Sequence, residues 1–112
     1  MGVRLALAVT LCLLGAVPAA LAQKSTEDGL KDCEKLAAVK FKQENGKFRK
    51  FEIDRKDVEE DKFAANVGTQ YVATVYFGKA TYQAESAPAE IGFVCLHAGL
   101  GKGAVFVYVL PR

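Results

Sequence analysis

Two cysteines and the only histidine are the residues of this sequence best suited to chemistry. One residue separates Cys95 from His97, and Cys33 lies far upstream. A thiol beside an imidazole can serve as a nucleophile, and two thiolates with an imidazole can supply three zinc ligands. Both chemistries need free thiols, whereas a pair of cysteines in an exported chain favours one disulfide. We therefore expect a Cys33–Cys95 bond, with no catalytic residue, no metal and no cofactor.

The amino-terminal segment predicts export. Arg4 precedes an apolar run over residues 5–17, Pro18 follows, and Ala20-Leu21-Ala22 has the small-x-small pattern of a signal peptidase site. The run is shorter than the ~20 apolar residues that span a bilayer. We expect residues 1–22 to be a removed signal peptide and the protein to be secreted or periplasmic, without stable membrane insertion.

Residues 23–112 are long enough for one small domain. The whole chain carries a net charge of +2, with charges of both signs nearly balanced. A nucleic-acid-binding domain of this size usually has a clear basic excess. We therefore expect a protein partner rather than nucleic acid, and the oligomeric state is left open. The expected Cys33–Cys95 disulfide closes a loop of ~60 residues, which stabilises the fold by roughly 3–4 kcal/mol in the chain-entropy model.

Residues 28–44 predict an amphipathic helix. Ser25 or Thr26 can cap its start, and Asn45-Gly46 is a suitable stop. Apolar side chains recur at helical spacing along it: Leu30, Cys33, Leu36, Ala37 and Phe41.

Strand patterns follow the helix. They cover residues 47–60, 62–78, 91–99 and 104–112, with an acidic loop at 58–61, a loop at 86–90 and a glycine-rich hairpin turn at 99–103. In the second strand we expect Tyr71, Ala73, Val75 and Phe77 to form the row that faces the helix. One helix followed by four strands with short connections predicts an α+β fold, with the helix packed across a four-stranded antiparallel sheet.

Three other motifs are better explained by structure than by chemistry. The "GLGKG" segment lies between strands, whereas a phosphate-binding loop opens a helix. The "KFKQENGKFRKF" segment interleaves basic and aromatic residues, but acidic residues dilute it. The acidic run at 54–61 lacks the spacing and the glycine of a calcium loop. We expect a protein that is not an enzyme.

Two segments carry a resemblance to a known family. "GTQYVATVYFG", residues 68–78, and "HAGLGKG", residues 97–103, together with the order of elements, resemble the cystatin superfamily. The resemblance covers most of residues 23–112 in the order of elements and only a few positions in identity. It implies a cystatin-like fold, and it implies inhibition of papain-like cysteine proteases by a wedge of an amino-terminal glycine segment and two hairpins.

The hairpin motifs of that family map onto this sequence unevenly. In the Gln-x-Val-x-Gly hairpin, Gly68 takes the position of the glycine, while Ala64 and Asn66 stand at the glutamine and valine positions. Leu100 and Gly101 stand where the second hairpin carries Pro-Trp. The expected binding residues are the hairpin tips: Val67, Gly68, Leu100, Gly101 and Lys102.

We therefore expect an exported small binding protein. The family resemblance implies that it inhibits papain-like cysteine proteases. One alternative is a secreted or periplasmic domain that binds a small ligand or peptide, without inhibitory activity, in a pocket lined by Tyr71, Val75 and Phe93. Another is an assembly module, because the last strand is apolar on both faces and such an edge favours pairing.

Overall fold

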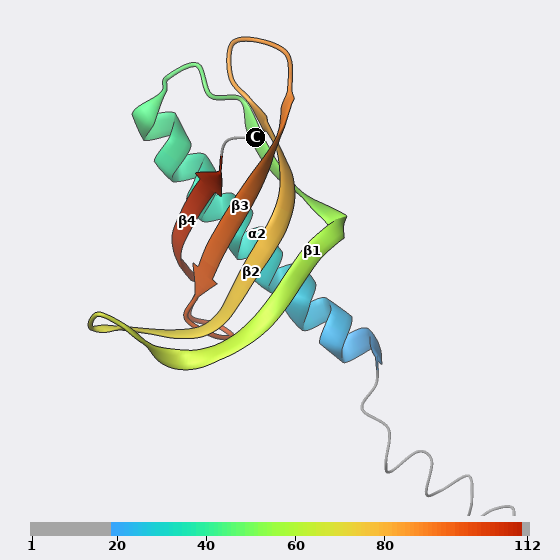
Figure 1. The fold of residues 1–112 in the computed structure, drawn as a ribbon, viewed down its shortest axis with the longest axis vertical. Helices are drawn as coiled ribbons and strands as arrows, with labels where there is room; N and C mark the ends of the chain where they lie inside the picture. The colour runs from blue at the N-terminus through green and yellow to red at the C-terminus, as the bar shows by residue number, and fades with distance from the viewer. Residues whose placement is uncertain (1–18, 111–112) are drawn as a thin grey trace, which may run out of the picture.

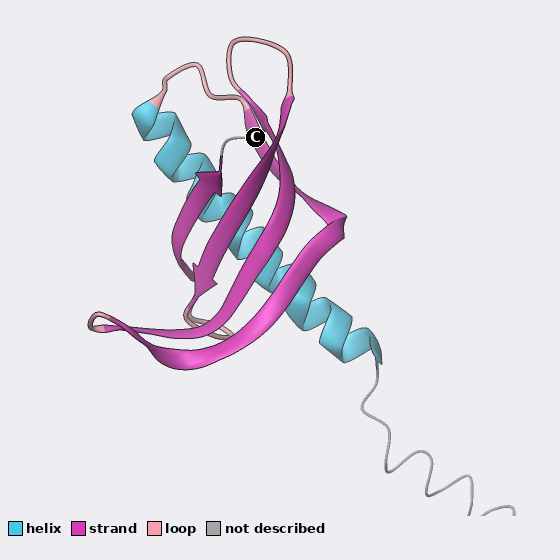
Figure 2. Cartoon of the chain, in the orientation of Figure 1, coloured by secondary structure: helices cyan, strands magenta, loops and turns pink. Residues whose placement is uncertain are grey.

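The computed structural model describes residues 19–110 of the chain. The helix α2 (Ala19–Glu44) comes first, and four strands follow: β1 (Lys50–Val67), β2 (Gln70–Gln83), β3 (Ala89–His97) and β4 (Ala104–Leu110). The strands form one antiparallel sheet in the order β1-β2-β3-β4 (Figures 1 and 2). The α+β fold predicted from the sequence is confirmed.

The helix crosses one face of the sheet diagonally, and no other described element covers the opposite face (Figure 1). The apolar stripe of α2 faces the sheet, with Leu30, Cys33, Ala37 and Phe41 all buried. Burying such a stripe against a sheet supplies most of the stability of an amphipathic helix. Within residues 19–110 the structure has no helix that is both long and apolar enough to cross a membrane.

The core is built from cross-strand rows on the helix-facing side of the sheet. Tyr76, Cys95 and Val107 are register partners on β2, β3 and β4, and all three are buried. At the other end of the sheet, Phe41 packs edge-on against Phe51, with ring centroids 5.6 Å apart. These rows fix the side of each strand that points to the helix, because side chains alternate along a strand.

The start of the helix differs from the prediction. The helix begins at Ala19, so Ser25 and Thr26 lie inside it and cap nothing. No glycine or proline stands between Ala19 and Asp28, and alanine has the highest helix propensity. The end at Glu44 agrees with the prediction, and Asn45 N–H still donates to the carbonyl of Phe41 at 2.8 Å. Residues 1–18 of the expected signal peptide lie outside the described residues.

The predicted acidic loop at 58–61 is wrong. β1 continues from Lys50 to Val67 and pairs with β2, with register shifts at 54–57 and 63–64. Pairing with β2 satisfies the backbone whatever the side chains carry, and charged residues are common on edge strands. Local charge therefore gave a false loop signal.

The predicted helix-facing row of β2 is also wrong. Tyr76 and Ala80 join the buried core under the helix, so Val75 and Phe77 point to the opposite face. Because β2 is apolar on both sides, alternation alone cannot choose its inner face. The disulfide makes the choice: Cys95 must point to the helix, and its register partner Tyr76 points the same way.

Candidate functional site

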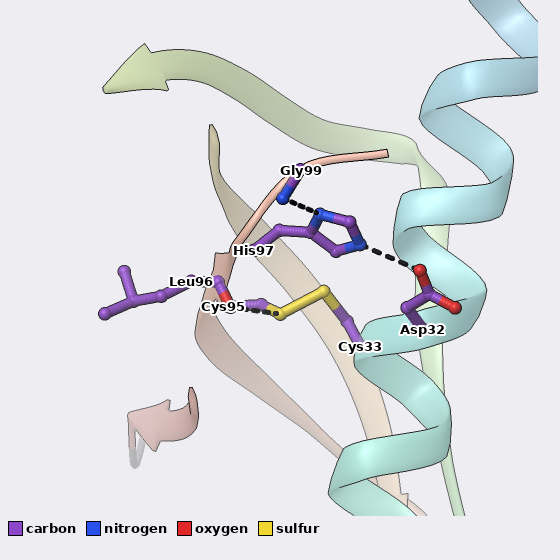
Figure 3. Close-up of a disulfide and its surroundings, with 6 residues drawn as sticks. All are labelled: Asp32, Cys33, Cys95, Leu96, His97 and Gly99. Atoms are coloured by element: carbon purple, nitrogen blue, oxygen red, sulfur yellow. Dashed lines mark hydrogen bonds and ion pairs between the residues drawn. A yellow bond between two sulfur atoms is a disulfide. The ribbon is translucent and has the colours of Figure 1, made fainter. Parts of the chain in front are cut away.

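The predicted disulfide joins α2 to β3. Cys33 and Cys95 are bonded with a Cα–Cα distance of 6.1 Å, and neither side chain is exposed (Figure 3). Cysteines joined in a buried disulfide have no free thiol, so they can act neither as a nucleophile nor as thiolate ligands. Among the described residues, no three His, Cys, Asp or Glu side chains gather as a metal site.

His97 is held by two hydrogen bonds beside that disulfide (Figure 3). Its Nε2 lies 2.8 Å from Asp32 Oδ2, and its Nδ1 accepts from the backbone N–H of Gly99 at 3.1 Å. Because Nδ1 accepts, the geometry selects the tautomer with hydrogen on Nε2. With both nitrogens engaged and the ring buried, the imidazole connects the helix to the β3–β4 loop and is not positioned to act as a base.

Sequence reasoning missed Asp32 as the partner of His97. The signal was available in the cysteine pair: Asp32 immediately precedes Cys33, and His97 follows Cys95 by two positions. A disulfide between the cysteines brings their neighbours close as well.

A polar hollow of about 580 Å³ lies beside this pair, between the first half of α2 and the sheet. Its lining includes Asp32, Glu60, Tyr76, His97 and Leu100. Burial, followed by the negative charges of Glu60 and Asp32, raises the pKa of Tyr76 to about 12. A hydrogen bond with Glu60 adds to this effect, so the phenol stays protonated there.

The β1–β2 hairpin extends beyond the rest of the sheet. The pairing of β2 with β3 ends at Thr74–His97, so the residues nearer the tip pair only across the hairpin. Val67 and Gln70 close a two-residue turn in which Gly68 has φ +63°, as expected for the first central residue of a type II′ turn. Gly68 is thus a turn residue, so the continuous strand predicted over 62–78 is wrong: its first part belongs to β1 and the rest to β2. The valine beside Gly68 is 47% exposed.

The β3–β4 loop forms the second tip. Ala98 N–H donates to the carbonyl of Gly103, and Lys102 N–H donates to the carbonyl of Gly99, both at 2.9 Å. The glycines at 99, 101 and 103 have positive φ, which only glycine adopts easily. Leu100 stands at this tip and is 80% exposed.

The two tips lie at the same end of the sheet. In the antiparallel order β1-β2-β3-β4, the first and third connections leave one end, while the connection at 84–88 leaves the other (Figure 1). The structure therefore brings Val67 and Gly68 to the same end as Leu100, Gly101 and Lys102, with the β1–β2 tip reaching further out.

The pocket expected from Tyr71, Val75 and Phe93 does not form. Phe93 is buried under the helix, whereas Val75 points to the opposite face. Tyr71 belongs to the extended part of the hairpin and is exposed. That expectation rested on the wrong inner face of β2.

No protein-family model, curated protein or solved structure matches this chain. The relation to cystatins therefore remains a proposal that rests on the order of the elements and the few residues quoted above.

Proposed function

We propose that this chain is an exported protein that binds a protein partner through its two hairpin tips, in the manner of a cystatin-like inhibitor of papain-like cysteine proteases. One observation carries the proposal: two hairpins leave the same end of the sheet with an exposed apolar residue at each tip, Val67 and Leu100. A wedge of this shape can enter a groove on a partner, where apolar anchors provide most of the binding energy.

The rigidity of both tips supports this function. The two-residue turn at Gly68 and the paired hydrogen bonds of the 98–103 loop leave few backbone conformations to lose on binding. A binding loop that is already ordered loses little entropy when its partner arrives. Lys102 adds a positive charge beside Leu100, which favours a partner groove with acidic residues.

The test is inhibition of papain by the chain purified from a secreting host, with direct binding measured in parallel. Val67→Asp and Leu100→Asp should each weaken binding by about tenfold or more, because a charge replaces an apolar anchor. Val39→Asp is the matched control, since this valine is also exposed, at 56%, but lies on the helix. Folded protein that neither binds nor inhibits papain at micromolar concentration refutes the inhibitor version.

The polar hollow supports a second function, binding of a small ligand without inhibition. Its volume of about 580 Å³ falls in the usual range for ligand sites. Its lining holds the phenol of Tyr76, which is hydrogen-bonded to Glu60, and the carboxylate of Asp32, whose Oδ2 is paired with His97. Titration of amino acids and dipeptides into ¹⁵N-labelled protein tests this function. Shifts at Thr74 and Gly99, lost in Tyr76→Phe, would support it, and unchanged spectra at millimolar ligand would exclude those ligands.

A further inference from the structure

An apolar groove lies next to the β1–β2 tip and away from the polar hollow. The extended hairpin passes the ends of β3 and β4 (Figure 1) and leaves a groove of about 410 Å³ between itself and these strands. Its lining combines hairpin residues with strand residues: Val67, Gln70, Val72, Leu96, Val105 and Phe106.

The groove is apolar and open to solvent. Val72 is completely buried, while Val67 and Phe106 remain 47% and 44% exposed. Gln70 is the only lining residue with a polar side chain, and its amide already donates to the carbonyl of Tyr71 at 3.0 Å. Covering such walls with an apolar group removes their hydrocarbon surface from water, which is the main favourable term in binding.

A positive charge stands at the β4 side of the groove. Lys40 Nζ lies 4.6 Å from the ring centroid of Phe106 and donates to the carbonyl of Val107 at 3.0 Å. No carboxylate among the described residues forms a salt bridge with it. Tyr108 stacks on Phe106, with centroids 6.4 Å apart, and extends the apolar surface along β4.

We infer that this groove binds an extended segment of a protein partner that places a leucine- or phenylalanine-sized side chain against Val67 and Phe106, and an acidic side chain within reach of Lys40. The volume is at the lower end for ligand sites and suits one or two side chains. The inference rests on the proposed function, because Val67 belongs to both the tip and the groove. It adds the chemistry of the partner: an apolar residue with an acidic neighbour.

The experiment uses the full chain from a secreting host and three capped dipeptides as probes: acetyl-Glu-Phe-amide, acetyl-Lys-Phe-amide and acetyl-Glu-Ala-amide. NMR titration should show the Glu-Phe peptide shifting the resonances of Val72, Leu96 and Phe106. The Lys-Phe peptide should bind about threefold to fivefold more weakly, which is the usual size of one exposed charge pair. The Glu-Ala peptide should bind at least about tenfold more weakly, because it lacks the apolar anchor.

Variants separate the groove from the tips. Phe106→Ala should abolish binding of the Glu-Phe peptide, and Lys40→Gln should remove the preference for glutamate over lysine. Leu100→Asp should weaken binding of the protein partner while leaving peptide binding unchanged, so the two proposals can fail separately. Equal binding of all three peptides, shifts confined to the hollow beside His97, or a groove occupied by a second copy in concentration-dependent dimers would each overturn the inference.

Discussion

Gly29 of α2 and Tyr76 of β2 are in direct contact, and the helix has no room for a side chain at position 29. A Cβ built on Gly29 would fall onto Tyr76 Oη and lie 2.7 Å from Cζ. The contact explains how a bulky tyrosine fits under the helix: it fills the space that the missing side chain leaves.

Gly29→Ala should therefore destabilise the protein. Alanine in a helix is ordinarily favoured over glycine by about 1 kcal/mol, but overpacking a core costs about 1–3 kcal/mol. We expect a net loss in the free energy of unfolding, measured by urea titration. Gly46→Ala is the control, because nothing lies within 4 Å of its built Cβ. A Tyr76→Leu background should remove most of the cost at position 29; a stabilising Gly29→Ala would contradict the contact.

Removing the disulfide should cost about 4 kcal/mol in the chain-entropy model, since the bond spans 62 positions of sequence. The double variant Cys33→Ala/Cys95→Ala should show this loss in urea unfolding. Because both sulfurs are buried, the native protein should also resist reduction and thiol labelling until it unfolds. Rapid labelling of the folded protein after mild reductant would contradict the burial.

The Asp32–His97 pair predicts a single imidazole tautomer. The ¹⁵N chemical shifts of His97 at pH 8 should show hydrogen on Nε2, because Nδ1 accepts from Gly99. Asp32→Ala should lower the free energy of unfolding by about 1–3 kcal/mol, the usual effect of leaving one buried donor without its partner. Asp32→Asn keeps an acceptor and should cost less. A mixture of tautomers would refute the arrangement.

Arg55 should make the protein more sensitive to acid. Its guanidinium bonds Glu27 and Glu34, and the hydrogen bond with Arg55 is the main reason why the pKa of Glu27 lies below its ordinary value of 4.5. A lowered carboxyl pKa adds stability above the ordinary value, and that stability is lost as pH falls through the lowered value.

We therefore expect the free energy of unfolding to fall below about pH 4.5, and to fall less steeply in Arg55→Met. Lys47→Met is the control, since the pair of Lys47 with Glu85 is 67% and 70% exposed and should contribute little. Identical acid slopes for the wild type and Arg55→Met would show that the ion pair has no effect on folding.

Tyr76 should make the protein less stable at high pH. Burial raises its pKa from 10.0 to about 12, so between these values the unfolded chain loses the proton and the folded chain keeps it. Stability should accordingly decline as pH rises from 10 to 12. Comparing urea unfolding of the wild type and Tyr76→Phe at pH 9 and 11 isolates this group. The decline should be smaller in the variant, and an equal decline would contradict the raised pKa.

The sequence predicted the order of the elements, the disulfide and the 99–103 turn, because each has a local signal. The 99–103 glycines mark a reversal, and the cysteines fall on the apolar faces of their elements. The strand pattern ran through Gly68 over 62–78, and only the family resemblance placed a hairpin tip there. The inner face of β2 could not be predicted from alternation, since Val75 and Tyr76 are both suited to a core. The continuity of β1 through 58–61 depends on pairing with β2, which a local pattern does not contain.

The candidate site was predicted only in part. The tip at 100–102 follows from turn chemistry, whereas the tip at Gly68 follows only from the family resemblance. The apolar groove could not be predicted. It forms where the β1–β2 hairpin extends beyond the end of β3, so that Val72 and Phe106 of β4 line the same groove. Lys40 reaches the same place from the helix, which no spacing in the sequence indicates.

The disulfide turns residues 33–95 into a closed loop of chain that holds β1, β2 and most of β3. Proteolysis tends to occur at exposed connections, and both the 84–88 loop and the β1–β2 tip lie inside this loop. A single cut at either place would leave the two fragments covalently joined, with the sheet still paired around the break. A protease can therefore cleave such a molecule once without separating it into two fragments.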